Sequence, residues 1–295
     1  MAESPAHKFG QIIGDVLEAS IEPLLRKFAS EYGLYLDRKG PRPARKGTKV
    51  SWTDLYGNVH DLDFVLEKDG NDDHTGIPVA FIETAWRRYT KHSRNKAQEI
   101  QGAILPLKTT YQNASPFIGA VLAGVFTDGA LTQLKSLGFT LLYFPYETVV
   151  SAFSKVGIDA HFEEDTPDSE LARQVRAWEA LSPRQRSRVA KALIKSNSKE
   201  VQGFMNALDR AVTRQIELVR VIPLHGTMFE WRGVEEAIAF IESYDEDNGS
   251  KPIVKYEIEI RYNNGDRING QFANKEDALQ FLRTYQPLAL RPVTM

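Results

Sequence analysis

The sequence predicts an α/β protein in which helices flank a mixed sheet, followed by a helical segment and a small α+β domain. The chain has 295 residues, which is more than one ordinary core accommodates. Hydrophobic residues make up 42% of it, which is enough to build packed cores. After an opening hairpin, short apolar runs alternate with segments of helical spacing, an order typical of a sheet with helices packed on it.

The elements of the first half follow from the spacing of apolar residues. A helix is expected over 8–32, because apolar residues recur at helical spacing and Gly33 stands at its end. Strands 49–53 and 60–66 flank a turn and form a hairpin. Strand 78–85 is almost entirely apolar and is therefore expected at the centre of the sheet. The elements expected after it are helix 93–107, strand 117–126, helix 129–137, strand 139–144 and helix 146–156.

The second half is expected to divide further. Residues 162–169 are acidic and lack periodic hydrophobic residues, so we expect a boundary there and a first domain of residues 1–163. A helical connector should span 164–213, with Ser182 and Pro183 starting one of its helices. Residues 214–295 repeat a strand, turn, strand and helix, which predicts a small domain of two β-β-α units around one four-stranded sheet.

Composition excludes several classes of protein. The chain has no cysteine, so disulfides, thiolate nucleophiles and cysteine-based zinc sites are excluded. It has no apolar run of about 18 residues, so no membrane span is expected. Its first residues lack the basic and then apolar layout of a signal peptide. We therefore expect a cytoplasmic protein.

Basic side chains gather in three stretches of a chain that is nearly neutral overall. The net charge is −2, which argues against a general polyanion binder. Residues 38–49 and 87–96 nevertheless carry basic side chains and no acid, and residues 184–199 form a third basic stretch. Such clusters suit a nucleic-acid cleft, and the alternative is that each is a solvated face.

Two acids interrupt otherwise apolar strands. Asp63 lies in strand 60–66 and Glu83 in strand 78–85, although acidic residues are depleted in strands. Because one polar loop joins these strands, the two carboxylates can converge on a divalent cation, which prefers oxygen ligands. Such a metal lowers the pKa of bound water and neutralises charge on a phosphate.

Other interpretations of these acids stay open. Asp63 is otherwise a surface acid on an edge strand, and Glu83 is otherwise ion-paired with a neighbouring arginine. Asp61 lies two residues before Asp63 on the same strand face, so it is a second candidate for the ligand.

This placement of acids resembles the PD-(D/E)XK nuclease superfamily, which includes most restriction endonucleases. Members have a helix, a three-stranded meander, a crossover helix and a further strand. Their motif is Asp on the second strand, then Glu or Asp, any residue and Lys on the third. Asp63 matches the first acid and Glu83 the second, and the resemblance covers about residues 8–160. It implies a restriction-endonuclease-like fold for the first domain. It also implies a metal-binding acid in the first helix, for which Glu18 is the first choice and Glu22 the second.

The chain departs from this family at the motif lysine, where Ala85 stands. In some members the lysine function has moved to the following helix, and Lys96 is the best candidate for that move, with Lys91 second. The other explanation is a dead site. In that case the protein is a non-catalytic nucleic-acid-binding or protein-binding module on a decayed nuclease core.

The resemblance implies an endonuclease that depends on Mg²⁺ and cleaves double-stranded DNA, of restriction type and acting as a homodimer. Asp63 and Glu83 would bind the metal together with Glu18, and Lys96 would orient water and stabilise the charge of the transition state. The small C-terminal domain would supply specificity or dimer contacts. Contacts to backbone phosphates are expected from Arg42, Arg45, Lys46, Arg87, Arg88, Lys91 and Arg94.

Overall fold

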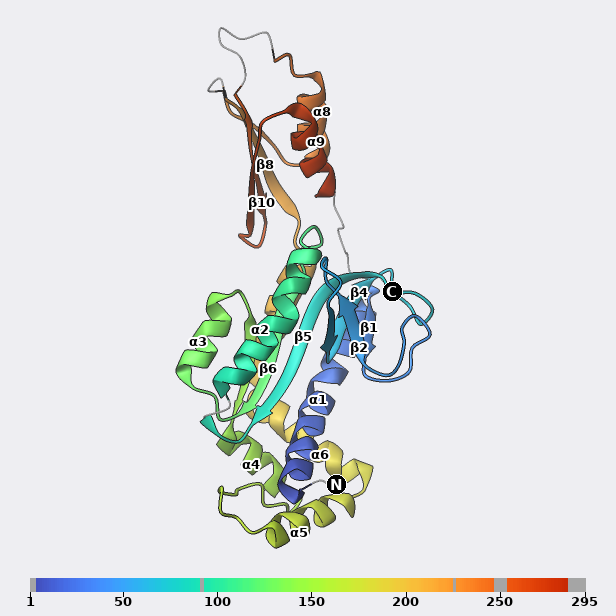
Figure 1. Cartoon of the computed structure of the whole chain (residues 1–295), viewed down its shortest axis with the longest axis vertical. Helices are drawn as coiled ribbons and strands as arrows, with labels where there is room; N and C mark the ends of the chain where they lie inside the picture. The colour runs from blue at the N-terminus through green and yellow to red at the C-terminus, as the bar shows by residue number, and fades with distance from the viewer. Residues whose placement is uncertain (1–3, 91–92, 225–226, 247–253, 286–295) are drawn as a thin grey trace. The chain divides into compact units, whose positions relative to one another are not determined.

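The chain forms two compact units, one of residues up to Leu208 and one that starts at Asp209. The structure, a computed structural model, describes residues 4–90, 93–224, 227–246 and 254–285. Figure 1 shows the helices and strands of both units.

The first unit is built on a mixed five-stranded sheet. Its strands lie in the order β1 (Tyr35–Arg38), β4 (Phe64–Lys68), β5 (Ile77–Arg87), β6 (Phe117–Gly124) and β7 (Thr140–Pro145). The first two neighbouring pairs are antiparallel, and β5, β6 and β7 run parallel. The predicted α/β class with a mixed sheet is therefore confirmed, and β5 is the central strand, as its apolar sequence predicted.

The strand expected over 60–66 is divided between two sheets. Its first half, β3 (Val59–Leu62), pairs with β2 (Val50–Thr53) in a separate hairpin. Its second half, β4, pairs with β5 and with β1, a strand that the sequence did not predict. Asp63 is the one residue between the two halves, so it stands where the chain changes partners.

Helices α1 to α4 pack on the sheet. Helix α1 (Pro5–Tyr32) begins after a Ser4 cap and ends at Gly33, whose φ of 64° is the left-handed geometry that glycine adopts freely. Helices α2 (Ser93–Thr110) and α3 (Asp128–Ser136) share an apolar cluster with β5 and β6 on one face, as Figure 1 shows. Helix α4 (Tyr146–Ser154) packs on β6 and β7, and α1 packs on β5 and β1.

The helices after the acidic stretch belong to the first unit. Helices α5 (Asp168–Glu179) and α6 (Pro183–Ser196) pack on α1, and α7 (Ser198–Val212) follows. Trp178 of α5 lies 5.3 Å from the ring of Phe153, and Phe204 of α7 lies 5.5 Å from that of Phe117. The first unit therefore extends to about Leu208, whereas the sequence placed its end near 163 and expected a separate connector over 164–213.

The second unit has the predicted pair of β-β-α repeats. Its antiparallel sheet has the order β11 (Arg267–Phe272), β10 (Tyr256–Tyr262), β8 (Ile216–Pro223) and β9 (Phe229–Trp231). Helices α8 (Val234–Ser243) and α9 (Lys275–Thr284) pack on each other and on the sheet. Each repeat contributes one central and one edge strand, so neither repeat buries its apolar face without the other.

Candidate functional site

Asp63 and Glu83 meet where the ladder between β4 and β5 ends. The ladder pairs Phe64 with Ile82, and one further antiparallel step places Asp63 opposite Glu83. The Asp63 carboxylate accepts hydrogen bonds from the Thr84 backbone N–H at 2.7 Å and from the Thr84 hydroxyl at 2.8 Å. It thus supplies the acceptor that β4 would provide if its ladder continued, which fixes its position beside β5.

Glu83 is a buried acid in an unfavourable electrostatic position. Burial raises the pKa of its carboxyl group well above the usual range, and the negative charges of Asp63 and Glu18 raise it further. The positive charge of Lys96 and the backbone N–H of Asp63 act in the opposite direction. Groups from α1, the β3–β4 junction and α2 therefore all act on this one carboxyl group.

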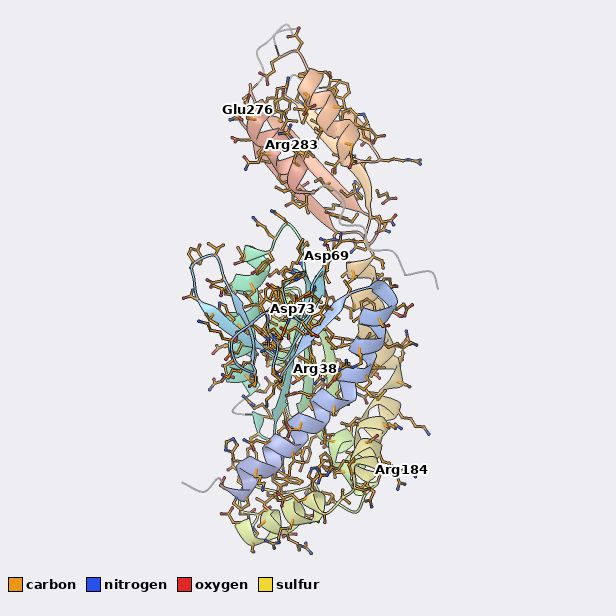
Figure 2. The ribbon with its side chains drawn as sticks, turned by 90° about the vertical axis from the view of Figure 1, so that its right-hand side faces the viewer. Arg38, Asp69, Asp73, Arg184, Glu276 and Arg283 are labelled. Atoms are coloured by element: carbon orange, nitrogen blue, oxygen red, sulfur yellow. The ribbon has the colours of Figure 1, made fainter. Side chains whose placement is uncertain are left out.

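Glu18 is the acid of α1 that joins this group. Burial raises the pKa of Glu18 to about 7, followed by the charges of Asp63 and Asp15, while Lys39 lowers it. Glu22, the second choice, is instead paired with Arg26 of its own helix and with Arg38 at the end of β1. Figure 2 labels Arg38, which lies beside α1.

The chemistry of these acids suits a divalent cation, although the described residues do not form a complete site. Glu18, Asp63 and Glu83 offer only carboxylate oxygens, the ligands that Mg²⁺ prefers. Burial and, after it, the repulsion between these acids raise the pKa values of Glu18 and Glu83, and a bound cation would relieve that repulsion. Within the described residues, however, no three acids or histidines are close enough to share one ion, so their side chains would have to turn to do so.

Ala85 and Lys96 lie on the same side of the sheet. Alternation along β5 puts Phe81, Glu83 and Ala85 on one face. Phe81 and Ala85 lie in the apolar cluster that includes Ala97 of α2, and Lys96 is the residue before Ala97. The Lys96 ammonium lies 3.4 Å from Glu99, and its charge reaches Glu83. Helix α2 thus brings Lys96 close to Glu83, which lies two residues before Ala85 on β5.

The basic residues after β5 differ in what they contact. Arg88 is largely buried: it donates to the Phe162 carbonyl, pairs with Glu163 at 3.4 Å and lies over the Tyr146 ring. Its guanidinium group holds the segment after α4 in place. Arg87 is half-buried and pairs with Glu99 at 3.5 Å, and Arg94 is exposed near the start of α2. Lys91 lies outside the described residues.

Two arginines of the first basic stretch, Arg42 and Arg45, form an internal clamp. Arg42 is buried and donates to both carboxylate oxygens of the fully buried Glu67, at 2.6 and 3.0 Å. It also pairs with the buried Asp37 at 2.9 Å, and Arg45 pairs with Asp37 at 3.1 Å. These two arginines fold the loop onto β1 and β4, so they are not placed to contact phosphate. Lys46 is exposed.

The Asp61 carboxylate is bound by residues of the β2–β3 hairpin. Its carboxylate accepts from Lys49 at 2.6 Å and from Ser51 at 2.7 Å, across the β2–β3 hairpin. The hydrogen bond from Lys49 lowers its pKa, followed by that from Ser51. Asp61 is therefore an ion-paired residue of the hairpin surface.

Two residues of the site were missed by sequence reasoning. Thr84 anchors Asp63, and exposed Lys39 acts on Glu18 although it lies outside the apolar strands that drew attention. The motif places Thr84 at its unspecified position, and Lys39 was visible only as one of several bases in its stretch. Neither residue carries a signal of its own, because both reach the site through tertiary contacts.

The fold and side chains thus define an α/β protein with a group of carboxylates and a lysine on a mixed sheet. Among the described helices, none is long and apolar enough to cross a membrane. No known protein-family model matches the chain, and no curated protein matches it. The crystal structure of a protein of unknown function, AF1548, is similar with 9% identity and a TM-score of 0.28, over 66% of this chain and 98% of the other. A TM-score this low assigns neither fold nor activity.

Proposed function

We propose that this protein is a Mg²⁺-dependent endonuclease that hydrolyses phosphodiester bonds of DNA. The observation that carries the proposal is that three acids and one lysine from four separate elements lie close enough for their charges to interact. Glu18 comes from α1, Asp63 from the β3–β4 junction, Glu83 from β5 and Lys96 from α2, and their charges act on one another. Perturbed acids that gather with a cation in this way are a frequent mark of catalytic sites.

Asp63, Glu83 and Glu18 are the residues that would hold the metal. A bound Mg²⁺ supplies Lewis acidity toward the phosphate and a more acidic water. The two hydrogen bonds from Thr84 orient the Asp63 carboxylate beside β5. Loss of the proton from Glu83 and Glu18 would accompany metal binding, so we expect the affinity for metal to rise with pH.

Lys96 takes the role of the absent motif lysine in this proposal. Its amine is mostly shielded by the protein and lies on the α2 side of Glu83, so it can donate to a phosphate oxygen while the stem stays packed. Arg87, Arg94, Lys46 and Lys39 are the remaining bases proposed to contact backbone phosphates. Arg42, Arg45 and Arg88 are left out because their charges are used inside the unit.

We propose double-stranded DNA as the substrate, a homodimer as the active form, a restriction-type role and a cytoplasmic location. The second unit, whose fold is separate, would supply specificity or dimer contacts.

The test is cleavage of plasmid DNA by the purified chain with Mg²⁺. Asp63→Asn and Glu83→Gln keep the shape of each side chain but remove the charge, so each should reduce cleavage by at least about 100-fold. Asp61→Asn is the matched control, because Asp61 lies two residues from Asp63 and is ion-paired on the hairpin. Unchanged cleavage by both site variants would overturn the assignment.

A non-catalytic binding module is the second candidate, and two observations favour it. Ala85 occupies the lysine position, and one oxygen of the Asp63 carboxylate, Oδ2, already accepts two hydrogen bonds from Thr84. A wild-type chain that binds DNA but yields no cleavage with Mg²⁺ or Mn²⁺ would establish this candidate in place of the nuclease.

A further inference from the structure

Helix α6 carries a row of basic side chains that the proposed site does not use. Arg184, Arg188, Lys191 and Lys195 are separated by four, three and four residues, and all four are exposed. Since successive helical residues turn by about 100°, these positions fall within an arc of about 60° on one face. They define what we call the α6 stripe. Arg184, at its start, lies at the outer edge of the first unit in Figure 2.

The opposite face of α6 explains why the stripe points outward. Val189 and Leu193 are buried where the helix packs on α1 and α4. Arg186, which lies off the stripe, is used internally: it donates to the Glu179 carbonyl at 2.7 Å and lies over the Trp178 ring. Packing therefore fixes the orientation of the helix and leaves the stripe to solvent.

The charges of the stripe are not neutralised within the part of the chain that the structure describes. No ion pair or hydrogen bond joins any of the four side chains to another described residue. Residues 183–199 contain no acid, and Lys199 adds a fifth exposed base just after the helix ends. Some exposed bases elsewhere in the unit, Arg26 and Lys49 among them, do have acidic partners. Four uncompensated like charges on one helix face repel one another, and an anionic partner would remove that repulsion.

The length of the stripe fits a polymer of phosphates better than one small anion. Arg184 and Lys195 are separated along the helix axis by about 16 Å, at 1.5 Å per residue. Each strand of B-DNA presents a phosphate about every 3.4 Å along its axis. One stripe can therefore meet several phosphates of a backbone, and two of its four side chains are arginines, which bind phosphate with a fork of donors.

The features of α6 disfavour a membrane surface as the partner. Helices that lie on membranes insert an apolar face beside their basic residues. The apolar face of α6 is already buried against α1 and α4, and none of the large exposed hydrophobic side chains in the described residues lies on this helix.

We infer that the α6 stripe is a binding surface for the phosphate backbone of nucleic acid. It contributes affinity without reading sequence, because its contacts are charge contacts to phosphates. The inference does not depend on the proposed hydrolysis, since α6 contributes no residue to the acid site.

The test measures binding of the full chain to a fluorescently labelled DNA duplex of mixed sequence. Fluorescence anisotropy gives the affinity in EDTA at several salt concentrations. The double variants are Arg184→Ala with Arg188→Ala, and Lys191→Ala with Lys195→Ala. If each side chain neutralises one phosphate, each double variant reduces the slope of log affinity against log salt by about 2. Affinity near 0.15 M salt should fall by about tenfold.

The matched control is Lys135→Ala with Lys155→Ala, which removes the same charge from exposed positions on α3 and after α4. It should leave the slope unchanged. Alanine favours helix, so the stripe variants should fold, and circular dichroism checks this. If one did not fold, Lys191→Gln with Lys195→Gln would replace it.

The inference would be overturned if both stripe variants kept the wild-type slope, or if the control variant lost as much slope as they do. Binding to vesicles of phosphatidylserine and phosphatidylcholine is measured in parallel. If the stripe variants lost affinity for the vesicles but kept their affinity for DNA, the inference would also be overturned. The proposed function fails differently. Stripe-dependent binding without Mg²⁺-dependent cleavage would end the nuclease proposal and keep the stripe. Mg²⁺-dependent cleavage together with DNA binding that is unchanged in the stripe variants would keep the nuclease proposal and end the inference about the stripe.

Discussion

At the scale of single residues, the site is defined by acids that the fold holds at an electrostatic cost. Glu83 is buried beside Asp63, and Glu18 is close enough for its charge to act on both. Such an arrangement lowers the free energy of unfolding whenever the acids are ionised. Acids with perturbed pKa values of this kind cluster at functional sites. The cost is measurable apart from any activity.

Glu18→Gln should stabilise the protein at pH 8 and have little effect at pH 4. The pKa of Glu18 is raised from 4.5 to about 7 in the folded chain, so the stability it contributes is present below about pH 4.5 and is lost as pH rises through 7. Gln cannot ionise and avoids this loss. Because Glu18 is partly accessible, solvent screens the effect, and we expect a melting temperature about 2–4 °C higher at pH 8.

The measurement is thermal unfolding in EDTA at both pH values, with Glu22→Gln as control. Glu22 accepts from Arg26 and pairs with Arg38, so its replacement removes favourable pairs and should not stabilise at pH 8. Equal stabilisation by the two variants would mean that general charge, rather than the acid cluster, sets the effect.

Lys96→Ala should reduce the rate of cleavage by about 100-fold or more, as expected for losing one positioned charge-stabilising group. Single-turnover cleavage at saturating protein measures this, because affinity for DNA then no longer limits the rate. Lys108→Ala removes a lysine from the last turn of the same helix and is the control. If Lys96→Ala cleaves normally while Lys91→Ala does not, the lysine function belongs to Lys91. If both cleave normally, water is activated without a lysine.

At the scale of elements, buried ion pairs fix the loop between β1 and β2. Arg42 joins Glu67 of β4 to Asp37 of β1 and also donates to the carbonyls of Asn71 and His74. Two loops that are distant in sequence are thereby tied to one edge of the sheet. The exposed bases near this clamp, Lys39 among them, depend on it for their position.

Arg42→Ala should destabilise the first unit by about 3–5 kcal/mol, because it leaves the fully buried Glu67 without its main partner. Combining it with Glu67→Gln should recover part of the loss, since an uncharged amide costs less to bury. Chemical denaturation measures both variants. A stable Arg42→Ala variant with weakened DNA binding would instead assign Arg42 to phosphate contact, as its sequence suggested.

At the scale of the whole molecule, the helices after residue 163 complete the first unit. The buried side chains of α5 and α6 pack on α1, and Phe204 of α7 packs on Phe117 of β6. Removing them would expose the apolar surfaces of α1 and the sheet. The second unit has its own core and sheet.

A chain ending at Thr213 should therefore fold with a cooperative thermal transition and keep any Mg²⁺-dependent cleavage. A chain ending at residue 163 should aggregate or lack such a transition, because it loses the packing partners of α1. Calorimetry of the two truncated chains checks this. A cooperative transition in the shorter chain would restore the boundary that the acidic stretch suggested.

The sequence by itself determined the elements whose signal is local. The apolar run of β5, the helical spacing of α1 with Gly33 after it, and the repeated β-β-α units were all readable, because each depends on periodicity within one segment. Asp63 and Glu83 were noticeable for the same reason, since a carboxylate in an apolar strand conflicts with its neighbours.

Only the tertiary structure decided which charges are free and which are used. Arg42 and Arg184 look alike in sequence, each within a basic stretch, yet one is buried between two acids and the other is exposed on α6. The four-residue β1 was too short to show a period. The physical reason is that an ion pair, a strand partner or a buried helix face joins residues far apart in the chain, and such pairings leave no periodic signal in either segment.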